Sequence, residues 1–297
     1  MRIFLTGATG FIGSAIVTEL IGAGHQVVGL TRSDAGAQAL SAAGAEVYVG
    51  NLEDPASLRD GAANSDAVIH TAFDHNFENF VANCEKDRRV IEALGDALQG
   101  TDRPLIITSG TGMGSLAPGQ TATEDNFDRD NPNPRRASEL AGISVAERGV
   151  NVSVVRLPQV HDTVKQGLIT PFIAVTREKG KVAYVGDGSN RWPAVHVSDA
   201  AHLYRLAVEK QERGARYHAV AEEGIPTRDI AEVIGKGLKL PVVSLSAEEA
   251  GQHFGWLGPF ASWDLPASSQ QTQQRLNWHP TGPGLLTDLE NMRYFDI

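Results

Sequence analysis

Short apolar runs recur at regular intervals through the first half of this chain. They occupy residues 3–5, 27–30, 47–49, 68–70, 105–108 and 152–155. Continuous apolar runs of this length, rich in branched side chains, are typical of strands buried on both faces of a parallel sheet. Helix-period stretches separate the runs. One covers residues 15–21 and stops at Gly22 and Gly24, and another covers 89–98 and stops at Gly100.

This alternation predicts an α/β fold of the Rossmann type, with a doubly wound parallel sheet whose ligand lies at the carboxyl ends of the strands. After Pro158 the alternation weakens, and Pro, Gly, Trp and His become more frequent. We therefore expect a dinucleotide-binding Rossmann domain over residues 1–162 and a smaller, mainly substrate-binding region over 163–297. The assignment of residues 191–208 to one of these two regions is left open, because their strand-like and helical stretches also fit the main sheet.

Composition narrows the class of protein. Hydrophobic residues make up 41% and charged residues 21% of the 297 residues, which is ordinary globular usage. The net charge of −10, with scattered basic residues, argues against a nucleic-acid-binding surface. The single cysteine, Cys84, fits a reducing compartment, no leader precedes the first strand, and no apolar stretch reaches the roughly 18 residues of a membrane span. We expect a cytoplasmic protein with neither nucleic-acid nor membrane partners.

A glycine-rich turn follows the first apolar run and precedes the first helical pattern. Its residues are Thr6, Gly7, Ala8, Thr9, Gly10, Phe11, Ile12 and Gly13. Gly7 permits the tight turn out of the strand, Gly10 allows the backbone to approach a pyrophosphate, and Gly13 allows close packing of helix and strand. The sequence predicts dinucleotide binding here, with Thr6, Gly7, Thr9, Gly10, Phe11, Ile12 and Gly13 as cofactor-binding residues. The alternative is an ordinary glycine-rich loop.

The residues after the second run indicate which dinucleotide is bound. NAD-binding proteins carry an acid about 20 residues past the glycine motif, on the adenosine ribose. That acid is absent here, and Arg32 follows the strand instead. A guanidinium pairs with a 2′-phosphate and stacks on adenine, so we expect NADP. NAD stays open, because a slipped register brings Asp34 to the ribose.

Several further segments, in their order and spacing, resemble the extended short-chain dehydrogenase/reductase superfamily over nearly the whole chain. These segments are the glycine motif and residues 51–54, 68–72, 83, 90–93, 107–110, 156–160, 192–201 and 276–280. The resemblance implies that Asn51 and Leu52 lie at the adenine, Thr71, Ala72 and Phe73 along the ribose and pyrophosphate, Thr108 beside them, and Pro158 and Val160 at the nicotinamide amide. Asn51 alternatively serves a turn, and Pro158 alternatively ends a strand.

The chain departs from the superfamily at its catalytic pair. Members carry a Tyr that transfers the proton and, four residues later, a Lys that lowers the tyrosine pKa and holds the nicotinamide ribose. By the resemblance, Arg135 occupies the tyrosine position and Glu139 the lysine position, and no Tyr is followed four residues later by Lys anywhere in the chain. The chain therefore resembles an atypical member without the pair.

Other side chains must then supply the catalytic groups. Ser109 and Thr111 lie where the family places its catalytic Ser or Thr, Arg136 or Arg135 is suited to polarise a carbonyl or to bind an anion, and His75 and His161 follow predicted strands. Ordinary alternatives are turn chemistry for the hydroxyls, solvated arginines and structural histidines. Trp256, Phe260 and Trp263 line either an apolar pocket or a satellite core. No metal site is evident from the spacing of the nine histidines.

These features predict an NAD(P)-dependent oxidoreductase, with NADPH reducing a small carbonyl or related unsaturated substrate through a non-standard site. One alternative is a non-catalytic NADP(H)-binding sensor. Another is an epimerase or dehydratase, although those reactions in relatives use the Tyr and Lys directly. The expected partner is a small-molecule substrate, and the sequence fits a monomer or a homodimer.

Overall fold

A seven-stranded parallel sheet forms the centre of the protein. The computed structural model describes residues 1–294. The strand order is β3-β2-β1-β4-β5-β6-β10. Their bounds are β1 (Arg2–Thr6), β2 (Gln26–Thr31), β3 (Glu46–Val49), β4 (Ala67–His70), β5 (Pro104–Gly110), β6 (Asn151–Leu157) and β10 (Arg216–His218). Each of the six apolar runs lies within one of these strands, which confirms the doubly wound α/β prediction.

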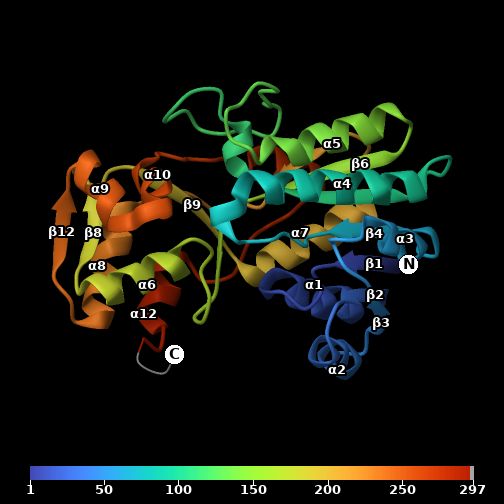
Figure 1. Cartoon of the computed structure of the whole chain (residues 1–297), viewed down its shortest axis with the longest axis horizontal. Coiled ribbons are helices and arrows are strands. Elements are labelled where there is room, and N and C mark those ends of the chain that lie inside the picture. Colours follow the sequence, from blue (N-terminus) through green and yellow to red (C-terminus); the bar gives the residue numbers. More distant parts are fainter. Residues whose placement is uncertain (295–297) are drawn as a thin grey trace.

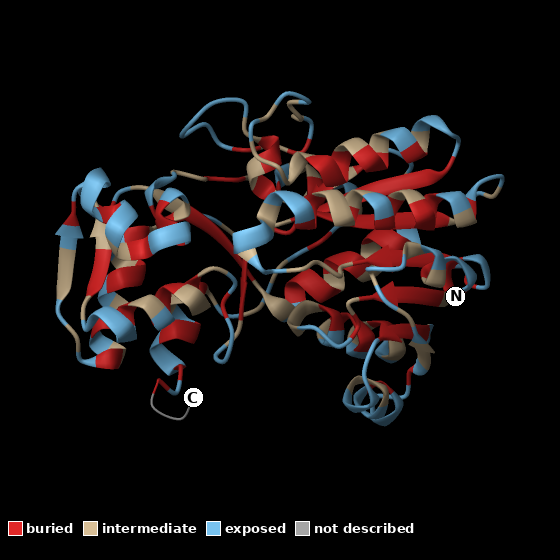
Figure 2. Cartoon of the chain, in the orientation of Figure 1, coloured by how far each residue is buried: buried red, intermediate tan, exposed pale blue. Residues whose placement is uncertain are grey.

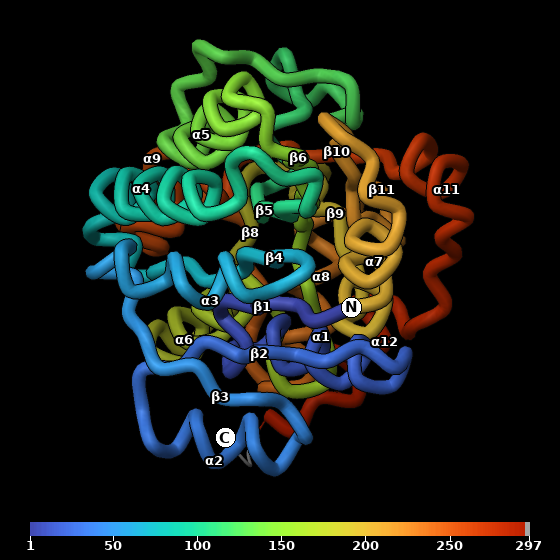
Figure 3. Tube along the Cα trace, turned by 90° about the vertical axis from the view of Figure 1, so that its right-hand side faces the viewer, coloured from blue at the N-terminus to red at the C-terminus, as the bar shows by residue number. Residues whose placement is uncertain are grey.

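Helices cover both faces of this sheet. The α3 (Arg59–Ala63), α4 (Phe80–Leu98) and α5 (Arg136–Glu147) helices pack on one face, and α1 (Phe11–Gly22), α2 (Asp34–Ala42) and α7 (Val197–Lys210) pack on the other. Figure 3 shows α4 and α7 on opposite sides of the strands. The strand order reverses between β1 and β4, and ligands of such sheets bind in the crevice at this switch point.

A second lobe lies beside the sheet (Figure 1). It contains the strands β8 (Val182–Val185) and β12 (Val242–Leu245) and the helices α6 (Ile169–Lys179), α8 (Thr227–Leu238), α9 (Ala247–Phe254), α10 (Gly258–Ser262) and α12 (Leu285–Asn291) around their own apolar core. A three-stranded sheet, β7 (Gln159–His161), β9 (Arg191–His196) and β11 (Glu222–Pro226), connects it to the first lobe. Figure 2 shows buried residues concentrated inside both lobes.

The chain returns to the main sheet after entering the second lobe. Residues 191–208 divide between the lobes, because β9 lies in the three-stranded sheet whereas α7 packs against α1. The edge strand β10 and the neighbouring helix α11 (Gln270–Leu276) were not expected from the sequence. The β10 strand is only three residues long, which is too short to produce a readable apolar run.

The α4 helix begins at Phe80, whereas the sequence pattern predicts a start at residue 89. Its buried stripe continues towards the amino terminus through Asp87, Cys84 and Asn83. Two polar side chains therefore occupy positions that face the interior, and these positions hide the 3.6-residue apolar period.

Candidate functional site

The glycine turn connects β1 to α1. The fold requires a glycine at positions 7 and 13, whereas it has room for a side chain at position 10. Gly7 adopts a φ of +72°, and a Cβ on Gly13 would stand 1.9 Å from the Gly7 carbonyl oxygen. A Cβ on Gly10 would meet only that same oxygen, at 3.1 Å. Gly10 is also exposed. Packing within the chain thus accounts for Gly7 and Gly13, while the space outside Gly10 is available to a ligand.

The amino terminus of α1 opens onto that space. Gly10 is the N-cap, no side chain caps the helix, and the first turn holds no acidic residue. The first N–H groups of this twelve-residue helix are therefore free to bind an anion, and the helix dipole favours negative charge there. Exposed Thr9 and half-buried Phe11 and Ile12 border the opening. This cradle fits the pyrophosphate of a dinucleotide.

The end of β2 presents Arg32 to solvent. Arg32 is exposed and forms no ion pair with any residue in the range 1–294. Ser33 caps α2 by accepting a hydrogen bond from the Gly36 N–H, and Asp34 begins the helix. The guanidinium is thus without an ion-pair partner at the end of the second strand, where dinucleotide-binding Rossmann folds bind the adenosine ribose.

Other residues assigned to the cofactor have varied surroundings. The Asn51 side chain accepts the Glu53 N–H and so closes a turn, and Leu52 packs partly against the core. The Thr71 hydroxyl donates to the Thr6 carbonyl, which fixes this segment against the glycine turn. Pro158 is half-buried between β6 and β7, and the Val160 side chain lies in the core, so only its backbone can face a ligand.

Lys165, which was not among the predicted site residues, lies on the loop after β7 near the amino terminus of α1. Its ammonium lies 5.9 Å from the centroid of the Phe11 ring. It is exposed and has no carboxylate partner in the described part of the chain. A free cation beside the helix opening suits a phosphate-bearing ligand.

A buried chain of hydrogen bonds joins the carboxyl ends of β1 and β4 to α4. The Thr6 hydroxyl lies 2.6 Å from His70 Nδ1, and His70 Nε2 lies 2.9 Å from Asp87 Oδ1. The Ala72 N–H donates to the Thr6 hydroxyl, which leaves that hydroxyl to donate to His70. His70 Nε2 then donates to Asp87, and the imidazole fixes the direction of the carboxylate.

The other oxygen of Asp87 holds Arg135 at the start of α5. Arg135 Nη1 lies 2.7 Å from Asp87 Oδ2, and the Ser138 hydroxyl donates to the same oxygen at 2.5 Å. Burial opposes ionisation of Asp87, but the charge of Arg135 and the hydrogen bonds from His70 and Ser138 outweigh it and lower the Asp87 pKa to about 2. The carboxylate is therefore ionised at neutral pH.

Arg135 is nearly buried and still has donors to spare. Its Nη2 donates to the Thr108 carbonyl at 3.0 Å, and its guanidinium lies 4.0 Å from the centroid of the Phe73 ring. Its side chain is only 14% exposed. Among the described residues, Nε–H and one Nη2–H have no acceptor. The guanidinium is thus held rigidly with hydrogens left to bind an oxygen.

The end of β5 contributes two hydroxyls with different roles. The Thr108 hydroxyl is used internally, because it donates to the His70 carbonyl and contacts the Tyr204 hydroxyl at 2.6 Å. The Ser109 hydroxyl is buried and has no partner among residues 1–294. An unsatisfied buried hydroxyl is costly, so Ser109 is suited to bind a group that a ligand supplies. Thr111 follows in the short helix η3 (Thr111–Gly114) and is also buried.

Arg136 and Glu139 face away from this cluster. Arg136 donates to the backbone carbonyls of Asp130 and Asn131, so it holds a surface loop. Arg136 was one of the two arginines expected to bind a substrate oxygen, and its contacts with the loop do not fit that role. Its neighbour Arg135 has the side chain that turns towards β5. Glu139 is fully buried, but both its oxygens accept from Arg156, at 2.8 and 2.9 Å. It is part of an internal ion pair.

The two candidate histidines are also separated. The His75 ring lies on an exposed segment beside Phe73, 5.3 Å away between centroids. Crowding of this ring by protein atoms and the charge of Arg135 lower the pKa of His75. It therefore lies close to the Arg135 cluster and is mostly neutral at neutral pH.

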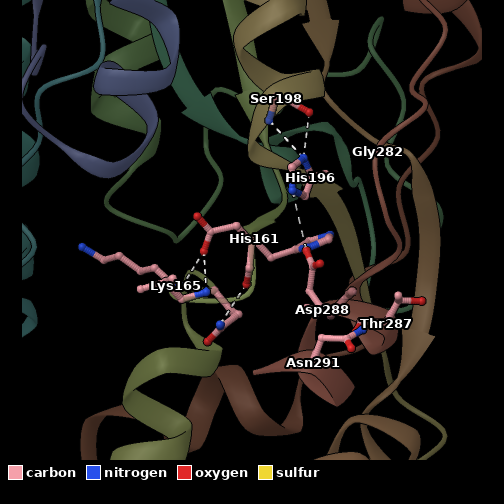
Figure 4. A network of polar contacts seen from close by, with 12 residues as sticks. His161, Lys165, His196, Ser198, Gly282, Thr287, Asp288 and Asn291 are labelled. Carbon is pink, nitrogen blue, oxygen red and sulfur yellow. Dashed lines mark hydrogen bonds and ion pairs between the residues drawn. The ribbon is translucent and has the colours of Figure 1, made fainter. Parts of the chain in front are cut away.

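His161 belongs to a different group of side chains, in the second lobe. Figure 4 shows His161, His196 and Asp288 pointing towards one another, while Lys165 extends away. His161 is fully buried, and its Nδ1 lies 2.6 Å from Asp288 Oδ2. Burial lowers the His161 pKa against the opposing effect of Asp288. His161 therefore fastens α12 to β7, and the structure does not bring it to the Arg135 cluster.

Aromatic side chains extend from Phe73 towards the second lobe. Phe77, in the short helix η2 (Phe77–Asn79), stacks on Trp256, in η4 (Gly255–Leu257), with centroids 4.4 Å apart and planes 7° from parallel. Phe260 contacts both of these rings, and Trp263 contacts Phe260. The aromatic residues that the sequence analysis grouped therefore lie together, joined by Phe77 from the first lobe.

His70, Asp87 and Ser138 were not predicted as site residues. The contacts that join them to Thr6 and to one another span 17 to 64 positions of the chain, so no local spacing connects them. The only local signal is a charged residue, Asp87, on the apolar stripe of α4, where a buried charge needs a partner.

Residues 1–294 contain neither a membrane-crossing helix nor a metal-binding cluster. No helix there has both the length and the apolar character needed to cross a membrane. Within the same range, no three His, Cys, Asp or Glu side chains gather in an arrangement that could hold a metal ion.

Comparisons with known proteins agree with this architecture. The model of the NAD dependent epimerase/dehydratase family matches residues 3–221. An uncharacterized protein of Schizosaccharomyces pombe is 51% identical over 99% of this chain and 100% of its own length. An uncharacterized protein of Saccharomyces cerevisiae is 43% identical over 97% of this chain and 98% of its own.

A solved structure has the same fold. The dTDP-glucose 4,6-dehydratase of Streptomyces venezuelae, with NAD and TYD bound, superposes with a TM-score of 0.79 and covers 100% of this chain and 97% of its own. Its sequence identity is 18%, so this similarity concerns the fold alone.

Proposed function

The chain belongs to the NAD dependent epimerase/dehydratase family, and from this premise we propose that it is an NADPH-dependent reductase of carbonyl compounds. The cofactor, when bound, supplies a hydride from C4 of its nicotinamide to the carbonyl carbon, and the carbonyl oxygen takes up a proton to give an alcohol and NADP⁺. The observation that carries the proposal is the rigidly held Arg135, with free N–H groups at the carboxyl ends of β4 and β5.

In this proposal Arg135 and Ser109 both donate hydrogen bonds to the carbonyl oxygen of the substrate. Hydride addition places negative charge on that oxygen, and a preorganised cation with free donors stabilises such charge in a water-poor site. The unpartnered Ser109 hydroxyl adds a second donor. Asp87, His70 and Ser138 are positioning residues, because they hold the guanidinium rather than contact substrate. The proton comes from water, and His75 on its exposed segment is the candidate to relay it.

NADPH is the proposed cofactor because Arg32 stands unpaired after β2. A guanidinium binds a 2′-phosphate through charge-assisted hydrogen bonds, whereas the ribose 2′-hydroxyl of NADH needs an acceptor. Asp34 is an acceptor, but it begins α2 three residues past the end of β2. The Lys165 ammonium adds positive charge beside the pyrophosphate cradle.

An epimerase or dehydratase is the less suitable proposal for this site. In the superfamily that the sequence resembles, both reactions use the Tyr and Lys pair directly, and this chain has an arginine and an internally paired glutamate at those positions. A non-catalytic NADP(H) sensor is the second candidate, and the absence of that pair is the observation that favours it.

The experiment is a turnover assay with a matched pair of arginines. The purified protein is mixed with NADPH and a panel of aldehydes and ketones, and loss of nicotinamide absorbance is followed. Wild type should oxidise NADPH. Arg135→Lys should lower kcat at least about tenfold while NADPH affinity stays unchanged, because the fork of donors is lost, and Arg136→Lys should behave as wild type. Tight NADPH binding without turnover on any carbonyl would support the sensor instead.

A further inference from the structure

The aromatic side chains at the meeting point of the lobes form a continuous ladder, comprising Phe73, Phe77, Phe80, Trp256, Phe260 and Trp263. Adjacent rings have centroids 4.4 to 6.3 Å apart. The ladder holds six of the nineteen Phe, Trp and Tyr residues of a chain that is only 6% aromatic. It begins against the Arg135 guanidinium, through Phe73, and ends at Trp263 in the second lobe.

The ladder differs from the aromatic residues of the cores. Core rings such as Phe4 and Phe254 are at most 2% exposed, whereas Trp256 and Trp263 are 41% and 42% exposed. No ladder residue is buried. Large apolar side chains that stay in contact with water lose the free energy of burial, and an exposed cluster of them marks a place where a ligand binds. Fold stability therefore does not account for the exposed position of Trp256 and Trp263.

The geometry of its central pair points to the shape of the ligand. Phe77 and Trp256 come from segments about 180 residues apart in sequence and lie nearly parallel. Parallel faces accept a flat π-system by stacking, and an edge-to-face neighbour such as Phe260 closes its rim. A saturated, puckered ring contacts such faces through its C–H groups, is thicker than a flat ring and has no π face of its own, so two parallel faces suit it less well.

We infer that the ladder is the specificity subsite of this enzyme, and that its substrate is an aryl ketone or aryl aldehyde whose ring lies against Phe77 and Trp256 while its carbonyl oxygen lies at Arg135. This inference rests on the proposed reductase function and adds the substrate class. The chemistry is the reduction already written, with hydride to the carbonyl carbon, a proton to its oxygen and NADP⁺ released. The bound ring separates Phe77 from Trp256, so binding opens their stack.

The test compares two ketones of the same skeleton, acetophenone and cyclohexyl methyl ketone, with propanal as a carbonyl that has no ring. In wild type, kcat/KM should favour acetophenone over the saturated ketone by about threefold to tenfold, the usual contribution of one aromatic stack. Phe77→Leu and Trp256→Leu should bring this ratio close to unity, and the change should appear in KM for acetophenone. Leu116→Ala removes an exposed apolar side chain outside the ladder and should leave the ratio as in wild type.

The outcomes separate this inference from the proposed function. Turnover of propanal with no preference for acetophenone, or a preference that survives both ladder variants, would overturn the subsite while the reductase stands. If no carbonyl is turned over, saturation-transfer NMR of acetophenone with the NADPH complex tests the ladder alone. Binding that disappears in Trp256→Leu would support the subsite without the reductase, and no binding would overturn it.

Discussion

Asp87 determines where the Arg135 guanidinium points, although it lies in another helix. One of its oxygens accepts from His70 and the other from Arg135 and Ser138. The side chains of this pair are 3% and 14% exposed, so neither charge has water to replace a lost partner. Removing one member of such a pair leaves the other buried and uncompensated.

Asp87→Asn should therefore lower the free energy of unfolding by about 3–5 kcal/mol, because the variant leaves a buried cation without its counter-charge. Asp96→Asn is the matched control, since Asp96 pairs with Arg59 and Arg148 on the surface and its side chain is 36% exposed. The control should cost less than about 1 kcal/mol. Urea unfolding measures both, and equal losses would show that Asp87 does not hold Arg135 as described.

His218, which contacts the buried Arg156, should make the free energy of unfolding depend on pH. Its Nδ1–H donates to the Ser268 carbonyl at 2.8 Å, and its Nε2 faces Arg156 at 3.2 Å. Burial and the charge of Arg156 lower its pKa to about 3. Between pH 6.5 and pH 3, His218 is therefore protonated in the unfolded chain but neutral in the folded chain. The free energy of unfolding is highest above the unfolded pKa of about 6.5 and decreases as the pH falls towards 3.

We expect the free energy of unfolding to fall by about 1.6 kcal/mol from this group between pH 6.5 and pH 5, at about 1.36 kcal/mol for each unit of pH over which the unfolded group is protonated. His218→Asn keeps a donor for Ser268 and cannot titrate, so its stability should change less over this interval. His279→Asn, at an exposed histidine, should retain the wild-type slope. Denaturation at a series of pH values tests this, and an unchanged slope in His218→Asn would assign the pH dependence to other groups.

At the scale of single residues, the sequence predicts those whose role is local. The role of the glycine turn can be predicted from the sequence, because all its residues are neighbours in the chain. Arg135 and Arg136 were both predicted as candidates, because two adjacent arginines at a helix start have no local feature that distinguishes them. The partners Asp87 and Thr108, 48 and 27 positions away, separate them in the fold.

The first helix is the element on which the proposed cofactor binding depends most. Its uncapped amino terminus, its lack of first-turn acids and the open space at Gly10 act together. Gly13 fixes how closely this helix approaches the turn, whereas Gly10 has a backbone conformation that alanine also adopts, with φ −78° and ψ 173°.

Gly10→Ala should consequently fold, with a loss of at most about 1 kcal/mol, and should bind NADPH at least about tenfold more weakly because its methyl group occupies the pyrophosphate space. Gly22→Ala, at the other end of the same helix, meets nothing within 4 Å and should bind as wild type. Nicotinamide fluorescence titration distinguishes them. Wild-type affinity in Gly10→Ala would place the cofactor elsewhere.

Helices and strands were predicted well where every residue is buried, and less well where buried positions hold both apolar and polar side chains. The six apolar runs correspond to β1 to β6 because a strand buried on both faces is apolar at every position. The start of α4 was placed nine residues late because Asn83 and Asp87 interrupt its apolar stripe. The three-residue β10 gave no pattern at all.

The whole molecule combines a cofactor lobe with a second lobe that supplies half of the aromatic ladder. The sequence predicts the two-part organisation from the loss of alternation after Pro158. It does not predict that Phe77 meets Trp256, because that contact depends on how the lobes are placed. Arg135 lies where the lobes meet the carboxyl ends of the strands, with Phe73 joining it to the ladder.

Transfer of deuterium from NADPH that carries deuterium at both C4 positions shows whether this protein reduces a carbonyl by hydride transfer. The carbonyl compound with the highest turnover is reduced with this cofactor, and the alcohol is analysed by mass spectrometry. We expect one deuterium on the carbinol carbon in wild type and a much lower rate of labelling in Arg135→Lys. An alcohol without deuterium, or an NADPH complex that reduces no carbonyl, would contradict it.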